Sequence, residues 1–85
     1  MNTEQEELIR FIFSNIRQLR KELTILYQEK EKLEILSDQF YISYMDSLWI
    51  KSHIQLLRVY EKILEKYTSL KNYELQIMNN IIKNT

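Results

Sequence analysis

Hydrophobic residues recur along the first half of the chain at the spacing of a coiled-coil helix. Six of them alternate at intervals of three and four residues: Ile9, Ile12, Ile16, Leu19, Leu23 and Leu26. This alternation places them on one stripe of an α-helix. The stripe continues through Lys30, Leu33, Ser37 and Phe40, where two of the four positions are polar. A capping box formed by Thr3 and Glu6 predicts that the helix begins near residue 4.

The second half of the chain carries a regular stripe of its own. Its residues alternate at intervals of four and three: Trp49, His53, Leu56, Tyr60, Ile63, Tyr67 and Leu70. A row of Ile50, Leu57 and Leu64 lies beside this stripe and makes the apolar face wide enough to contact two helices. Helical spacing then continues to the end of the chain through Leu70, Tyr73, Ile77 and Ile81.

The segment 40–57 is apolar over more of its circumference than either flank, so we expect it to be buried from several sides, by its own chain or by a partner. Ser37 and Asp38 predict a corner before it, because both side chains cap helices and disfavour helix interiors. Asp46 and Ser47 form a competing corner, which would leave residues 40–45 with nothing to pack on. A further corner near residues 68–72 is compatible with the polar residues there.

These patterns predict a single all-α domain over residues 1–85, with helices at about 4–36, 38–67 and 70–83. The helices could form a three-helix bundle, or a long antiparallel hairpin in which the last two are continuous. We favour the hairpin, associated as a homodimer in a larger helical bundle. The chain has no Gly and no Pro, which suits helices better than a sheet with tight turns. It has no Cys either, so oligomerisation is the remaining support for so small a domain.

The sequence offers little for catalysis, and we expect no enzyme, no cofactor, no metal site and no catalytic residue. His53 is the only histidine, and a single His without thiols cannot provide four zinc ligands. It lies one heptad after Asp46, about 10 Å along a helix axis, which is too far for a direct pair. We therefore interpret His53 as a core or interface residue, with a base or pH switch as the sharper alternative.

We expect the protein to bind another protein through an apolar helix face, with Tyr41, Met45 and Trp49 as the partner-binding patch. A phage or mobile-element inhibitor, an immunity or antitoxin protein and a coiled-coil subunit all belong to this regulatory or assembly class. The alternative is a dimeric nucleic-acid-binding regulator that uses the basic row of the first helix: Arg10, Arg17, Arg20 and Lys21. A net charge of zero favours the first hypothesis.

The location and origin of the protein are also suggested by composition. The acidic start and the interruption of the first apolar residues by Arg10 and Arg17 argue against a signal peptide. No apolar run approaches the roughly 20 residues of a membrane span. We therefore expect a cytoplasmic protein that does not bind membranes. The absence of Gly and Pro beside many Ile, Lys and Asn suggests an AT-rich genome.

Overall fold

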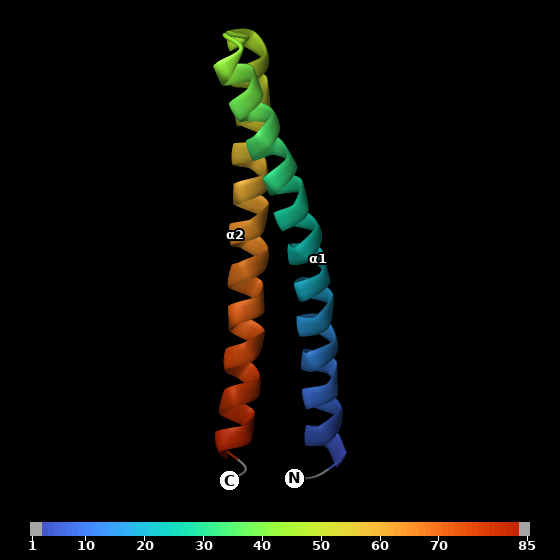
Figure 1. The fold of residues 1–85 in the computed structure, drawn as a ribbon. Helices are drawn as coiled ribbons and strands as arrows, with labels where there is room; N and C mark the ends of the chain where they lie inside the picture. The colour runs from blue at the N-terminus through green and yellow to red at the C-terminus, as the bar shows by residue number, and fades with distance from the viewer. Residues whose placement is uncertain (1–2, 84–85) are drawn as a thin grey trace.

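The computed structural model describes residues 3–83, which form two long helices joined by a short turn. Helix α1 is Thr3–Ile42 and helix α2 is Asp46–Lys83. The two run antiparallel and contact each other along the rod, so that the start of α1 and the end of α2 lie at one end and the turn at the other (Figure 1). The rod measures 62 × 15 × 14 Å. The predicted all-α class and the antiparallel hairpin are confirmed, and the described residues contain two helices instead of three.

The inner face of α1 follows the predicted stripe. All ten of its residues, from Ile9 to Phe40, are buried or half-buried. Six aliphatic side chains from both helices form the core at the open end of the hairpin: Ile12, Ile16, Leu19, Leu23, Leu70 and Ile77. Ile63 and Tyr73 pack against this cluster. The heptad spacing of α1 therefore identified the contact between the helices.

The inner face of α2 agrees with the predicted stripe only at every second position. Trp49, Leu56, Ile63 and Leu70 do face α1, but His53, Tyr60 and Tyr67 are exposed. The contacting positions between them lie one residue earlier, at Ser52, Val59 and Lys66. We call the contacting set the inner row: Trp49, Ser52, Leu56, Val59, Ile63, Lys66, Leu70, Tyr73, Ile77 and Asn80. The interpretation of His53 as a core residue of this chain is therefore wrong.

The corner predicted at Ser37 and Asp38 is also wrong, because α1 continues through both residues to Ile42. The Ser37 side chain occupies an inner position and is 4% exposed, and Ser52 on α2 is buried to the same extent. The Ser52 hydroxyl donates to the carbonyl of Trp49, 2.8 Å away. A serine that bonds within its own helix satisfies its hydroxyl without leaving the buried face. Here a serine fills a contact position and caps nothing.

The turn lies at residues 43–45, directly before the competing corner at Asp46 and Ser47. The Tyr44 amide donates to the carbonyl of Tyr41 and the Met45 amide to that of Phe40, at 3.2 and 2.9 Å. These two bonds form a Schellman motif, which ends a helix with one residue in the left-handed conformation. Tyr44 takes that conformation with φ of 58°. Segment 40–57 thus contains the turn, and its own chain does not bury it from several sides.

No corner forms at residues 68–72, and α2 is continuous. The Thr68 hydroxyl donates to the carbonyl of Leu64, and the Ser69 hydroxyl to that of Glu65. Both bonds run back by four residues within the helix, which satisfies the hydroxyls without interrupting it. From Asp46 onward, the predicted helices at 38–67 and 70–83 are therefore one helix, whereas residues 38–42 belong to α1.

Candidate functional site

Large apolar side chains gather without cover at the turn end of the hairpin. We call this surface the tip patch; it comprises Tyr41, Ile42, Tyr44, Met45 and Trp49. Tyr41 and Ile42 are 64% and 73% exposed, and Tyr44 is 90% exposed. Met45 is about half exposed and Trp49 is half-buried. The tip patch contains all three residues of the predicted partner-binding patch.

The aromatic rings at the tip form a ladder that crosses from one helix to the other. The Tyr41 and Trp49 ring centroids are 5.6 Å apart, with their planes tilted by 56°. Trp49 also stacks on His53, at 5.7 Å and 24°. Ring pairs at these separations attract each other beyond the area that they bury. The ladder therefore holds Tyr41 and Trp49 in place on the surface, and it gives the exposed His53 a structural neighbour.

Tyr44 is the residue at the tip whose presence the fold explains least. A left-handed backbone costs a residue with a Cβ about 1 kcal/mol or more, which is why glycine usually occupies this place in a Schellman motif. The Tyr44 side chain is almost fully exposed, so contacts within the hairpin do not offset that cost. A bulky aromatic residue is thus held at a strained position and pointed into solvent.

A second apolar surface extends along α2, one residue on from the inner row. We call it the outer row: Ile50, His53, Leu57, Tyr60, Leu64, Tyr67, Lys71, Glu74, Met78 and Ile81. Its spacing alternates by three and four, as in the inner row, and its direction differs by about 100° around the helix. Its large apolar members are between 38% and 68% exposed. The residues predicted beside the stripe, Ile50, Leu57 and Leu64, all belong to the outer row.

Two polar contacts show which part of α1 borders the outer row. Arg20 pairs with Glu74 at 3.1 Å, and the Tyr60 hydroxyl donates to Glu34 at 2.9 Å. Arg20 and Glu34 belong to a heptad row on α1 whose other members are Phe13, Tyr27 and Tyr41, all at least 45% exposed. The outer row and these three aromatic residues therefore form one flank of the hairpin.

The opposite flank has a different character. A groove there is lined largely by charged and amide side chains: Glu29, Lys32, Gln55, Arg58 and Lys62, together with Leu33 and Val59. Nearby, Lys66 pairs with Glu22 at 3.2 Å. Along residues 46–83, the exposed apolar residues of α2 therefore gather mainly on the flank that carries the outer row, where Lys71 and Glu74 interrupt them.

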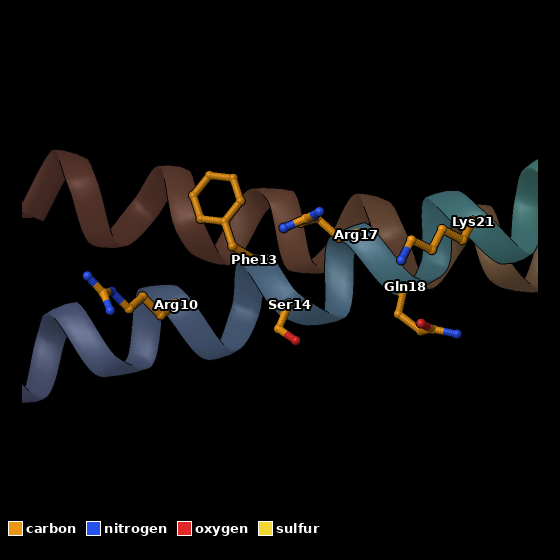
Figure 2. Close-up of a pocket in the computed structure, with 6 residues that line it drawn as sticks. All are labelled: Arg10, Phe13, Ser14, Arg17, Gln18 and Lys21. Carbon is orange, nitrogen blue, oxygen red and sulfur yellow. The ribbon is translucent and has the colours of Figure 1, made fainter.

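The basic row of α1 does not act as a unit. Arg10, Arg17 and Lys21 line a shallow depression with Phe13, Ser14 and Gln18 (Figure 2). Phe13 stands between Arg10 and Arg17 in this view. Arg20 is not part of that lining, because its guanidinium pairs with Glu74 of α2. The structure thus brings together three of the four predicted basic residues, next to an exposed aromatic ring.

Lys30, Glu34 and Tyr60 form a small polar network across the two helices. Glu34 accepts the Tyr60 hydroxyl and pairs with Lys30 at 3.2 Å, and the Lys30 amine lies 5.8 Å from the centre of the Tyr60 ring. The hydrogen bonds from Tyr60 and Lys30 lower the pKa of the Glu34 carboxyl. The bond to Glu34 raises the pKa of both Tyr60 and Lys30. The three side chains are half-buried or exposed, so the network contributes little to stability.

Metal-ligating side chains are scattered along the two helices. No group of three or more His, Cys, Asp or Glu side chains in residues 3–83 could hold a metal ion. Among helices α1 and α2, neither is long and apolar enough to cross a membrane.

Sequence reasoning missed two features of these surfaces. Ile42 and Tyr44 were absent from the predicted patch because the turn was expected elsewhere. The continuity of the outer row was hidden because the predicted stripe took alternate members from both rows. A search for two parallel heptad rows, offset by one residue, would have found it. The chain itself matches no family model, no curated protein and no solved structure.

Proposed function

We propose that the protein is a non-enzymatic regulatory or assembly factor that binds another protein through the tip patch. The observation that carries this proposal is Tyr44, a large aromatic side chain that is 90% exposed on a left-handed backbone. Strained positions persist where function requires them. An aromatic side chain at such a position, surrounded by Tyr41, Ile42 and Met45, supplies the kind of anchor that protein interfaces use.

The geometry of the rod supports the same proposal. The tip patch lies at the end of a hairpin 62 Å long, away from the core at the open end. The Tyr41–Trp49–His53 ladder orders its rings before any partner binds, which lowers the entropy cost of association. A convex tip of this kind fits a pocket or groove on the partner. Inhibitors of host machinery, immunity or antitoxin proteins and subunits of coiled-coil complexes are the classes to which we assign it.

The test uses Tyr44→Gly in the full chain. This variant removes the exposed ring and also relieves the backbone strain, so it should strengthen the fold while weakening partner binding. Proteins captured from lysate of the source cell by the immobilised wild-type chain would be identified, and the affinity of the purified partner for each variant measured. Loss of a buried aromatic anchor should weaken binding at least about 30-fold, equivalent to about 2 kcal/mol.

Two further variants make the result interpretable. Met45→Glu should weaken the same interaction, because it places a charge in the apolar patch. Gln76→Glu, an exposed site on α2 far from the turn, is the control and should bind as the wild type does. Binding that survives both Tyr44→Gly and Met45→Glu would contradict the proposal.

A second candidate function rests on the depression lined by Arg10, Arg17 and Lys21. Three cations beside the exposed Phe13 could contact phosphates while the ring stacks on a base. If nucleic acid binds here, its affinity should fall steeply with salt and fall further in Arg17→Glu. Arg20→Glu should matter less, because Arg20 is already paired with Glu74. An affinity independent of salt would eliminate this candidate.

A further inference from the structure

We infer that the outer row of α2 is the contact surface for a second copy of this chain, whose α2 lies antiparallel against it. Three properties of the hairpin support this assignment: its surface area, the regularity of the row and the placement of its charges. The outer row shares no residue with the tip patch, although the two meet where His53 stacks on Trp49, and the two proposals are tested with different variants.

The hairpin exposes more surface than a compact chain of the same mass. A compact protein of 10.5 kDa exposes roughly 5,400 Å², whereas this chain exposes 6892 Å². Its radius of gyration is 18.9 Å, against about 12 Å for a compact domain of this length. The excess is about 1,500 Å² per chain, or about 3,000 Å² for two chains. Obligate dimers bury roughly 2,000 to 5,000 Å² in total, so the excess corresponds to one such interface.

The regularity of the outer row points to a helix as its occupant. The ten positions of the row alternate at intervals of three and four over more than four heptads, and seven of them are apolar or aromatic. His53, Lys71 and Glu74 interrupt the apolar members. A straight helical partner with the same repeat covers such a row without interruption. Within residues 46–83, the outer row and the exposed Ile54, Leu75 and Ile82 beside it present one apolar surface, and the same surface of a second copy matches its repeat.

The flanks of the hairpin favour the same arrangement. The exposed aromatic residues of α1 that border the outer row, Phe13 and Tyr27, would cover the edges of the contact. On the opposite flank, α2 presents the charged Arg58 and Lys62, and the exposed Ile25 of α1 borders a groove that Lys62 and Lys66 also line. Self-association is therefore expected on the flank that carries the outer row.

Charge placement sets the relative direction of the two helices. In a parallel pair, Lys71 of one chain would face Lys71 of the other, and like charges at such a contact are destabilising. In an antiparallel pair centred between Leu64 and Tyr67, Ile50 lies opposite Ile81 and Lys71 lies opposite Tyr60. The two tip patches then lie at opposite ends of the dimer, where both remain free to bind partners.

The first experiment measures mass by light scattering over a concentration series. The wild type should have twice the chain mass, and Leu57→Glu with Leu64→Glu should raise the dissociation constant at least about 100-fold, because two charges enter an apolar contact. Circular dichroism should show unchanged helix, since both leucines lie outside the inner row. Gln55→Glu with Gln76→Glu adds the same charge to the opposite flank and should remain dimeric. A wild type that stays monomeric at every concentration would overturn the inference, as would a dimer weakened only by the control pair.

The second experiment tests direction by using the absence of native cysteine. Chains carrying Ile50→Cys and chains carrying Ile81→Cys are mixed and oxidised. These positions lie about 46 Å apart along α2, so a parallel and an antiparallel pair cannot be confused. The inference predicts disulfides between the two different chains. Disulfides that join only identical chains would contradict it, and neither result depends on whether the tip patch binds a partner.

Discussion

The inner and outer rows of α2 are nearly equal in composition and opposite in environment. Each has ten positions at alternating intervals of three and four, and seven of the ten are apolar or aromatic in both. In the inner row, Leu56 is 5% and Val59 4% exposed, whereas in the outer row Leu57 is 48% and Leu64 68% exposed. Helix α1 covers one row and leaves the other open. Amphipathic spacing alone therefore indicates that a helix face will be covered, without indicating by what.

The largest expected difference in stability is between alanine variants of the neighbouring residues Leu56 and Leu57. Leu56→Ala should lower the free energy of unfolding by about 2–4 kcal/mol, because it leaves a cavity against α1. Leu57→Ala should cost less than about 1 kcal/mol at the lowest workable concentration, since its side chain borders solvent within the hairpin. Urea unfolding of both variants measures the two free energies and checks this difference.

The two variants should also differ in how their effects depend on protein concentration. If a second copy covers the outer row, the cost of Leu57→Ala relative to the wild type should grow as the concentration rises. The cost of Leu56→Ala should stay the same, because Leu56 packs against α1 of its own chain. If the two variants lost the same free energy of unfolding at low concentration, the inner and outer rows would not differ in burial in solution as they do in the structure.

The next largest expected change in stability comes from a substitution in the turn. Tyr44→Gly should raise the free energy of unfolding by about 0.5–1 kcal/mol, because glycine takes the left-handed conformation without strain but adds freedom to the unfolded chain. Tyr44→Ala is the matched control, because it removes the ring and keeps the strained backbone. A gain in thermal stability for Ala as large as that for Gly would show that strain at residue 44 is not the cause.

The smallest effect is the pH dependence of the Lys30–Glu34–Tyr60 network. The pKa of Glu34 is lowered in the folded state, so its contribution is present above the ordinary carboxyl pKa and disappears as the pH falls through the lowered value. The pKa values of Tyr60 and Lys30 are raised, so their contribution is present below their ordinary values, near 10, and disappears as the pH rises through the raised ones. Melting temperatures of the wild type should therefore decrease at both extremes. In Glu34→Gln the melting temperature should decrease slightly less at both low and high pH. An unchanged pH dependence would contradict the role of the network.

The sequence predicted α1 better than α2 for a physical reason. On α1 only one heptad row is aliphatic, so Ile12, Ile16 and Leu19 identify the contact without ambiguity. On α2 the two rows are equally apolar, and the predicted stripe combined Leu56 of one with Tyr60 of the other. The row that α1 covers includes Ser52, which is buried near the turn as Ser37 is. Spacing along one helix contains no information about that choice.

The turn was misplaced because its chemistry lacks the usual signal. A Schellman motif is recognised by glycine, and this chain has none, so Tyr44 gave no indication of a helix end. Ser37 and Asp38 gave a false indication of a helix end. The objection to a later corner, that residues 40–45 would have nothing to pack on, describes the tip as it is found. Tyr41, Met45 and Trp49 were predicted as a patch from excess apolar area alone, and the fold brings them together at the tip.

The melting temperature of the wild-type chain as a function of its concentration tests the central claim most directly, which is that the outer row is covered by a second copy. A folded dimer that dissociates on unfolding is stabilised by mass action, so the melting temperature should rise steadily with concentration. A melting temperature that stays constant from low to high micromolar concentration would contradict the claim and leave the outer row without the occupant we assign to it.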